Sequence, residues 1–215
     1  MPTKDTRDIS LSVIRRLARY YRFLANLEKN DIYRISSLEI ARHMRLTASQ
    51  IRQDLNYFGG FGQQGYGYNV VQLRKELDRT LYLDNRLDAI LIGVGNLGRA
   101  LIGYLTREDQ SINLVGLFDQ NPTRLKEGIS EAEIMDISQI ERFCSEHKPV
   151  IAILCIPENN AQAMAERLVS FGIRGFWNFS HVDLRLGPTI LVENVHLGDS
   201  LTALGFQVHT KMLDD

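Results

Sequence analysis

The sequence predicts an α/β protein in which a small helical domain precedes a doubly wound parallel sheet. Three observations lead to this prediction. From residue 88 onwards, short apolar runs alternate with helical patterns. The first of these runs ends in a glycine turn of the form G-x-G-x-x-G. In the first eighty residues, two short capped helices precede a glycine-rich stretch.

Charge divides the 215-residue chain into two parts. Residues 1–82 carry 14 Lys and Arg against 8 Asp and Glu, a net of +6, while the remainder carries 11 against 18, a net of −7. This split favours a basic module that meets a polyanion, although a basic face is often only solvated. We place the domain boundary at Asp84-Asn85, which gives domains at 1–83 and 84–196 and a final segment at 197–215.

Composition excludes several classes of protein. The two cysteines, Cys144 and Cys155, have neither C-x-x-C spacing nor clustered His partners, which indicates a reducing compartment, inert thiols and no metal site. No apolar run approaches the roughly 18 residues of a membrane span, and the N-terminus lacks the apolar core of a signal peptide. We therefore expect a cytoplasmic protein without a membrane or metal partner.

The first helix is expected over residues 13–27, because its apolar residues recur at spacings of three and four. These residues are Val13, Ile14, Leu17, Tyr20, Tyr21, Leu24 and Leu27. The opposite face is basic. It carries Arg15, Arg16, Arg19 and Arg22.

A second helix is expected over residues 38–44, because Ser36 and Glu39 before it fit a capping box. Its expected core positions are Leu38, Ile40 and Ala41. Thr47 and Gln50 repeat the capping pattern and open a third helix over 48–58. Its expected buried face holds Ala48, Ile51, Leu55 and Phe58.

Two short capped helices in succession form a helix-turn-helix, whose second helix enters the major groove of DNA. The outward residues of this helix are Gln50, Arg52, Gln53 and Asn56. Gln and Asn can bond adenine bidentately, and Arg can do so to guanine. The helix therefore has the side chains that read base edges.

Residues 59–68 interleave five glycines with aromatic residues, which predicts a β-hairpin, the wing of a winged helix. A helix over 71–83, with Leu73, Leu77 and Leu81 inward, would connect the two domains. The alternative for residues 1–82 is a small helical domain used for protein contacts. The net charge of +6 and the hairpin weigh against it.

The glycine turn follows the apolar strand 89–93 and comprises Gly93, Gly95 and Gly98, with Asp119 at the end of the next apolar run. This order of strand, glycines, helix and acid is the fingerprint of a Rossmann-type dinucleotide site. Backbone N–H groups at the helix start would hold the phosphates. The alternative is a Rossmann-like domain with an empty site.

Further strands are expected at 113–118, 149–156, 175–179 and 189–193, and helices at 96–106, 136–147 and 159–171. Pro157 ends a continuously apolar run and lies where ligands of open α/β sheets bind, although it is equally explained as a strand stop. Asp119 would accept both adenosine ribose hydroxyls and repel a 2′-phosphate. This favours NAD(H) as the cofactor over its phosphorylated form.

Catalysis is not expected, because the histidines lack the partners that an acid–base site needs. These histidines are His147, His181, His196 and His209. We find no acid paired with His196 or His209 at a readable spacing. The segment after Gly198 is a helix-length amphipathic stretch with Leu201, Leu204 and Val208 on one face and Phe206 beside it. It would dock on its own domain or on a second subunit.

The chain resembles the Rex family of bacterial redox-sensing transcriptional repressors over nearly its full length. The resemblance rests on the sequence segments 20–24, 35–37, 50–59, 65–68 and 93–98 with Tyr104, and on 118–119, 155–157 and 177–179. It implies a homodimer with N-terminal winged helices, Rossmann domains and a C-terminal helix exchanged between subunits. It also implies that inverted-repeat operator DNA is bound when NAD⁺ dominates and released when NADH binds.

The motifs and the resemblance together give three sets of expected functional residues. The cofactor set is Gly93, Val94, Gly95, Asn96, Leu97, Gly98, Tyr104, Asp119 and Pro157. The DNA-facing set is Ser49, Gln50, Arg52, Gln53, Asn56, Tyr57, Gly65 and Tyr66. The switch set, which the resemblance implies responds to the redox state of the nicotinamide, is Arg22, Tyr104, His196 and Asp199.

Three residues depart from the family pattern. Gln53 stands where Lys or Arg is usual, His196 where Asp is common, and His181 where Pro is usual. Two other functions remain open: an NAD-dependent oxidoreductase with an accessory N-terminal domain, and a winged-helix regulator whose Rossmann domain serves only dimerisation.

Overall fold

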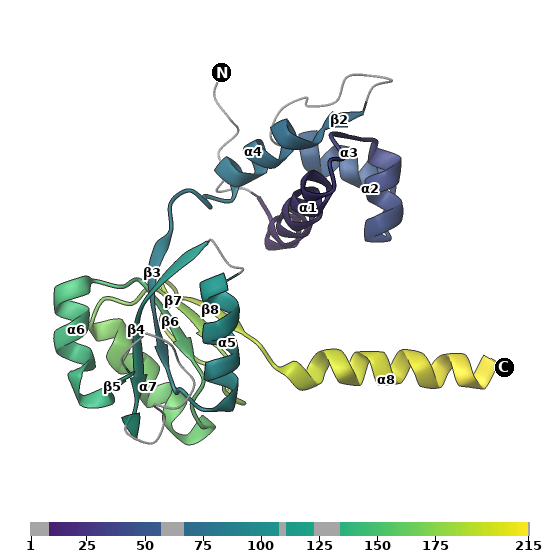
Figure 1. Ribbon diagram of the computed structural model, residues 1–215. Coiled ribbons are helices and arrows are strands. Elements are labelled where there is room, and N and C mark those ends of the chain that lie inside the picture. The colour runs from purple at the N-terminus through teal and green to yellow at the C-terminus, as the bar shows by residue number, and fades with distance from the viewer. Residues whose placement is uncertain (1–8, 57–66, 108–110, 123–133, 215) are drawn as a thin grey trace. The chain divides into compact units, whose positions relative to one another are not determined.

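The computed structural model describes residues 9–56, 67–107, 111–122 and 134–214. The chain divides into two compact units, Met1–Asn85 and Arg86–Asp215. Figure 1 shows the first unit in purple to blue and the sheet of the second in teal to green.

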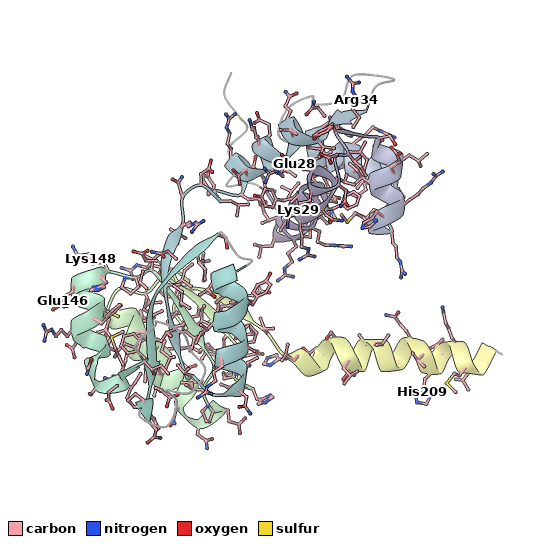
Figure 2. The ribbon with its side chains drawn as sticks, in the orientation of Figure 1. Glu28, Lys29, Arg34, Glu146, Lys148 and His209 are labelled. Atoms are coloured by element: carbon pink, nitrogen blue, oxygen red, sulfur yellow. The ribbon has the colours of Figure 1, made fainter. Side chains whose placement is uncertain are left out.

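The first unit contains four helices in its described residues: α1 (Leu11–Lys29), α2 (Ser37–Met44), α3 (Ala48–Asn56) and α4 (Val70–Thr80). The predicted periodicity of α1 is confirmed, since Val13, Leu17, Tyr20 and Leu24 are all buried. They pack with residues of the other three helices into one core, which includes Ile40, Ile51, Leu73 and Leu77. At the edge of this core, Arg74 Nε of α4 lies 2.6 Å from Oε2 of Glu28, which Figure 2 labels on α1.

The capping predictions hold in different degrees. The Ser36 hydroxyl accepts the Glu39 N–H at 3.2 Å, and the Glu39 carboxylate accepts the Ser36 N–H at 2.7 Å, which completes the capping box. At α3, Thr47 Oγ1 accepts the Gln50 N–H at 3.1 Å, but the Gln50 side chain turns to Asp54 instead of returning to Thr47. Of the two hydrogen bonds of a capping box, α3 therefore forms only the one from the Gln50 N–H to Thr47 among the described contacts.

Two expectations about the helices were wrong. Leu38, in the first turn of α2, is 50% exposed, because the helix buries Ile40, Ala41 and Met44 instead. The helix expected over 71–83 ends at Thr80, because the chain then turns, with Tyr82 at a φ of +54°. Leu81 is nevertheless partly buried against the core, as predicted.

A short antiparallel ribbon, which the sequence did not predict, joins β1 (Arg34–Ile35) to β2 (Tyr68–Asn69). Gly67 before β2 has a φ of +70°, and a Cβ there would lie 2.6 Å from the Ile35 carbonyl oxygen, so glycine is required. The rest of the predicted wing, and Phe58 of the predicted third helix, lie outside the described residues.

The second unit is built on a six-stranded parallel sheet in the order β5-β4-β3-β6-β7-β8. The strands are β3 (Leu87–Ile92), β4 (Ile112–Asp119), β5 (Ile134–Asp136), β6 (Ile151–Leu154), β7 (Gly175–Asn178) and β8 (Leu191–Asn194). Along the chain, strands are added to the sheet outwards from β3 on one side, as β4 and β5, and then outwards from β6 on the other side, as β7 and β8. This reversal is the topological switch point at which doubly wound sheets bind ligands.

Helices cover both faces of this sheet (Figure 1). On one face, Ile90 and Ile92 pack with residues of α6 (Ile140–His147) and α7 (Glu158–Ser170). On the other face, Leu91 packs with Ile102 and Leu105 of α5 (Asn96–Arg107). Burial of alternate residues on both sides explains why these strands read as unbroken apolar runs.

Two details of the sheet were not predicted. β5 is too short to give a pattern, and the helix expected over 136–147 consists of a 3₁₀ turn, Ile137–Gln139, followed by α6. Asp136 caps that turn by accepting the Ser138 N–H at 2.8 Å.

The last helix, α8 (Leu197–Asp214), is continuous, and every side chain described from 197 to 213 is exposed. Its leucines and Phe206 are between 55% and 85% exposed. His209, labelled in Figure 2, lies on this helix as expected. Across the described part of the chain, no helix has both the length and the apolar character needed to cross a membrane.

Candidate functional site

The glycine turn lies at the switch point, between the end of β3 and the start of α5. Gly93 is buried with a φ of +94°, and a Cβ on it would overlap the Cys155 carbonyl oxygen. A Cβ on Gly98 would overlap the Gly93 carbonyl oxygen. These two glycines are therefore required by the fold itself, since any side chain would push backbone apart.

Gly95 differs from its two neighbours. It is exposed, and a Cβ on it would meet no atom within 4 Å. The fold alone therefore does not require glycine here. The open space above Gly95 fits a ligand that must approach the backbone closely, as a pyrophosphate does at this position of the fingerprint.

Asp119 ends β4 and contacts the glycine turn directly. Its Oδ2 accepts the Val94 N–H at 2.8 Å, and its Oδ1 accepts the Asn121 N–H at 2.9 Å. The residue is only partly buried. Because each carboxylate oxygen has further lone pairs, Asp119 can still accept hydroxyl groups while it orders the turn.

Of the remaining predicted cofactor residues, Asn96, Leu97 and Pro157 lie at the carboxyl end of the sheet, whereas Tyr104 lies near the other end of α5. Asn96 is exposed and Leu97 partly buried in the first turn of α5, where N–H groups have no partner within the helix. Pro157 is exposed and precedes the first residue of α7, so it begins a helix as well as ending the β6 run. Tyr104, on α5, is 43% exposed.

The two thiols behave as predicted. Burial raises the pKa of the Cys155 thiol, beside the glycine turn, to about 12, and it also raises the pKa of the Cys144 thiol. Both are protonated at neutral pH and unreactive as nucleophiles.

His196 has a carboxylate partner that its sequence spacing did not reveal. Its Nε2 lies 2.8 Å from Oδ1 of Asp183, in the loop after β7. The hydrogen bond to Asp183, with the negative charges of Asp183 and Asp199, raises the pKa of His196. The partners are thirteen residues apart, and only the pairing of β7 with β8 brings them together. His181 in the same loop is exposed.

The predicted DNA-facing residues of α3 lie mostly on its exposed side. Ser49, Arg52, Gln53 and Asn56 are exposed, and Gln50 is half-buried. Arg52 Nη1 donates to the Ser37 hydroxyl at 3.2 Å, which holds the guanidinium near the start of α2. Tyr57, Gly65 and Tyr66 lie outside the described residues.

Asp54 is the residue of α3 that sequence reasoning missed. It is 1% exposed and accepts two hydrogen bonds from Arg16, at 2.6 and 2.7 Å. Arg16 was expected on the outward basic face of α1, but this ion pair draws it towards α3. Arg22, by contrast, is exposed, as predicted. A helical wheel could have identified Asp54 as buried. It places Asp54 beside the apolar face of α3, next to Leu55 and three residues after Ile51.

Comparison with known proteins agrees with this two-part architecture. The family described as putative DNA-binding protein N-terminus matches residues 8–56, and the CoA binding domain family matches residues 84–182. The redox-sensing transcriptional repressor Rex of Thermoanaerobacter pseudethanolicus (strain ATCC 33223 / 39E) is 50% identical over 211 residues, which cover 98% of this chain and 94% of the relative. Its namesake from Clostridium novyi (strain NT) is 47% identical over 200 residues, 93% and 95% of the two chains.

Solved structures give the same result. RSP in complex with β-NAD⁺ and operator DNA matches with a TM-score of 0.85 and 49% identity, covering 95% of this chain and 94% of that one. RSP in complex with β-NADH matches with a TM-score of 0.86 and 46% identity, covering 96% and 97%. Since identity near one half extends over almost the whole length of both partners, the chain belongs to the Rex family of redox-sensing transcriptional repressors.

Proposed function

We propose that this protein represses transcription by binding inverted-repeat operator DNA and that NADH binding releases it. The observation that carries the proposal is the sequence identity of 46–49% with RSP over 95–96% of this chain. The structure of RSP has been solved both with NAD⁺ and operator DNA and with NADH. Such a switch requires NADH to bind the released form more tightly than the DNA-bound form. The protein would act in the cytoplasm, where its DNA is.

The nucleotide would lie across the glycine turn. The open position at Gly95 supports this assignment, because it leaves room for the pyrophosphate beside the N–H groups of Asn96 and Leu97. The ribose hydroxyls would be accepted by Asp119, and Pro157 and Tyr104 would border the nicotinamide side. The negative charge of Asp119 favours NAD(H) over its 2′-phosphorylated form.

DNA would be read by α3 in a winged-helix domain at residues 1–83. Support comes from the exposure of Arg52, Gln53 and Asn56 and from the net charge of +6 of this region. Gln53 cannot supply the charge of a Lys or Arg, so this chain would make one fewer charged contact than the family pattern. Tyr57, Gly65 and Tyr66 would complete the interface.

The switch would run through Arg22, Tyr104, His196 and Asp199. In this chain His196 already has a partner in Asp183, so His196 would hold the loop after β7 to the end of β8. Asp199 then remains as the acid for Arg22 and Tyr104. We infer regulation and not turnover from the similarity to redox-sensing transcriptional repressors over nearly the whole chain.

The functional unit would be a homodimer that exchanges α8, residues 197–215, between subunits. Support comes from the apolar row Leu197, Leu201, Leu204 and Val208, which is between 48% and 69% exposed within one chain. A row of this size is costly to leave in water. Replacing Leu204 with Asp should convert the dimer to a monomer in light scattering, and an unchanged dimer would refute the exchange.

The decisive experiment measures DNA affinity by fluorescence anisotropy on an A/T-rich inverted repeat with NAD⁺, NADH or neither. We expect tight binding that saturating NADH alone abolishes, and a steep loss of affinity between roughly 50 and 200 mM salt. Equal affinity under all three conditions would leave only a DNA-binding protein with an unrelated second domain. Conversion of a 2-hydroxy acid or an alcohol with reduction of NAD⁺ would support an oxidoreductase.

Arg52→Ala should lose DNA and keep NADH, because Arg52 belongs to α3 and not to the unit that carries the glycine turn. Arg142→Ala is the matched control, since it removes the same charge from an exposed ion pair with Glu146 on α6. Retained operator affinity in Arg52→Ala would refute the assignment of α3 as the reading helix.

A further inference from the structure

The carboxylate of Asp54, a residue of α3, is buried against α1. Four hydrogen bonds end on this carboxylate. Besides the two from Arg16, Tyr20 Oη donates at 2.8 Å and Gln50 Nε2 at 2.9 Å. Since Asp54 is 1% exposed, water does not compete for these bonds.

The carboxylate is ionised at neutral pH. Burial alone would raise the pKa of Asp54, but the hydrogen bonds from Arg16, Tyr20 and Gln50, together with the charge of Arg16, outweigh it and lower the pKa below its ordinary value. An ionised carboxylate only accepts hydrogen bonds.

This fixes the orientation of the Gln50 amide. If the amide were reversed, its Oε1 would face a carboxylate oxygen at 2.9 Å, and neither atom could donate. The Nε2 group must therefore face Asp54. Among the described residues, Gln50 Oε1 and the second N–H of the amide have no recorded partner. Gln50 is half-buried on the side of α3 that also carries Ser49 and Gln53.

One acceptor beside one donor is the pattern that matches adenine in the major groove, where N6 donates and N7 accepts. Guanine presents two acceptors, O6 and N7, so the Gln50 Oε1 would oppose an acceptor there. An amide that is oriented before DNA arrives also loses less side-chain entropy on binding.

We propose that Asp54 is a positioning residue that holds the amide of Gln50 in the orientation that reads one adenine in each operator half-site. The inference deepens the proposed function and rests on it. Asp54 acts through Gln50 and touches no base itself.

The test is a base-by-base affinity profile. The full-length protein selects an inverted-repeat duplex from a randomised library, and each base pair of one half-site is then replaced in turn. For the unmodified protein we expect one A·T position at which replacement by G·C lowers the affinity roughly fivefold or more, as expected for the loss of one good base contact. This affinity penalty should depend on Gln50. Gln50→Met should remove the penalty at that position alone.

Asp54→Asn is the critical variant. The new amide can donate to Gln50 Oε1, so the orientation of Gln50 is no longer fixed and the same penalty should shrink although Gln50 is still present. A residue that only supported the fold would lower affinity equally for all sequences. Asp31→Asn is the matched control, because Asp31 is exposed, its carboxylate accepts only the Tyr33 hydroxyl among the contacts described, and the change should leave the profile unchanged.

A second variant leaves Asp54 in place, in case Asp54→Asn does not fold. Gln50→Lys can still donate to Asp54, but it has no acceptor, so the preferred base at that position should change from adenine to guanine. A preference that stays with adenine would overturn the inference, as would a full adenine penalty in a folded Asp54→Asn protein. A protein that selected no inverted repeat would overturn the proposed function together with the inference.

Discussion

Asp54 in the first unit and Asp119 in the second are both carboxylates to which we assign a functional role, but their surroundings are opposite. Asp54 is buried and accepts four bonds from three side chains, one of them a guanidinium. Asp119 is partly buried and accepts two backbone N–H groups, with no cation recorded against it in the described residues. The first is saturated by the protein itself. The second orders a loop and keeps lone pairs for a ligand.

The difference shows how the two acids should be tested. A saturated buried acid acts on stability and on the orientation of its neighbours, whereas an acid with spare acceptors acts on binding. The glycines follow the same division, since Gly93 and Gly98 are needed by the fold while the space at Gly95 is left open.

The largest effect is expected for Asp54→Ala. It removes every acceptor of the cluster and leaves Arg16, whose side chain is 22% exposed, without its carboxylate. Loss of a buried ion pair costs roughly 3–5 kcal/mol, and the partial exposure of Arg16 reduces this to about 2–3 kcal/mol. Urea unfolding of the protein measures it. A loss below about 1 kcal/mol would contradict the view that Asp54 is a saturated structural acid.

The same acid should make stability depend on pH. Because its pKa is lowered in the folded state, Asp54 contributes stability above its unfolded pKa of about 4, and this contribution is lost as pH falls through the folded value. Wild-type stability should therefore fall below about pH 4 more steeply than that of Asp54→Asn. Parallel curves for the two proteins would count against an ionised Asp54.

The next largest effects are expected for two glycine substitutions in the turn, Gly98→Ala and Gly95→Ala. The first places a methyl group against the Gly93 carbonyl and should cost about 2 kcal/mol or more, because the helix must move away from the strand. The second should leave the melting temperature within about 2 °C and weaken NADH binding roughly tenfold by occupying the pyrophosphate space. Calorimetric titration and thermal unfolding separate the two. Equal effects on both quantities would remove the distinction between the glycines.

Asp119→Ala should act mainly on the ligand. We expect a loss of about 1 kcal/mol or less in stability, the value of an ordinary hydrogen bond, and a loss of about tenfold in NADH affinity. Asp88→Ala is a suitable control, since that carboxylate also accepts a hydrogen bond, from Asn113 Nδ2 at 2.8 Å, but lies near the start of β3, at the end of the strand away from the glycine turn. If Asp119→Ala bound NADH with unchanged affinity, Asp119 would belong with the structural acids.

The smallest effect is expected at His196. Its pKa is raised by the hydrogen bond and the charge of Asp183, so the pair stabilises the loop below the unfolded pKa of about 6.5, and the contribution disappears as pH rises through the folded value. Asp183→Asn should lower the pKa of His196 in an NMR titration. Asp199 would still raise it slightly. A pKa that Asp183→Asn leaves unchanged would show that the pair does not form in solution.

The sequence by itself determined the elements whose signal is local. The capping box at Ser36, the glycine fingerprint with Asp119, and the apolar runs of the central strands each depend on residues within about 25 positions and on a fixed spacing, so the fold class and the glycine turn could be predicted. Leu38 shows the limit of such reasoning, because a periodic pattern does not say which side of the first helical turn meets the core.

Only the tertiary structure decided the contacts between distant segments. Asp54 meets Arg16 and Tyr20 across 38 and 34 residues, β1 pairs with β2 across about as many, and His196 meets Asp183 only because β7 and β8 are neighbours. A buried polar contact has no periodicity, since its free energy depends on desolvation and on partners that the fold supplies. For that reason the sequence predicted the exposed candidates for ligand contact more readily than the buried acid that bonds one of them.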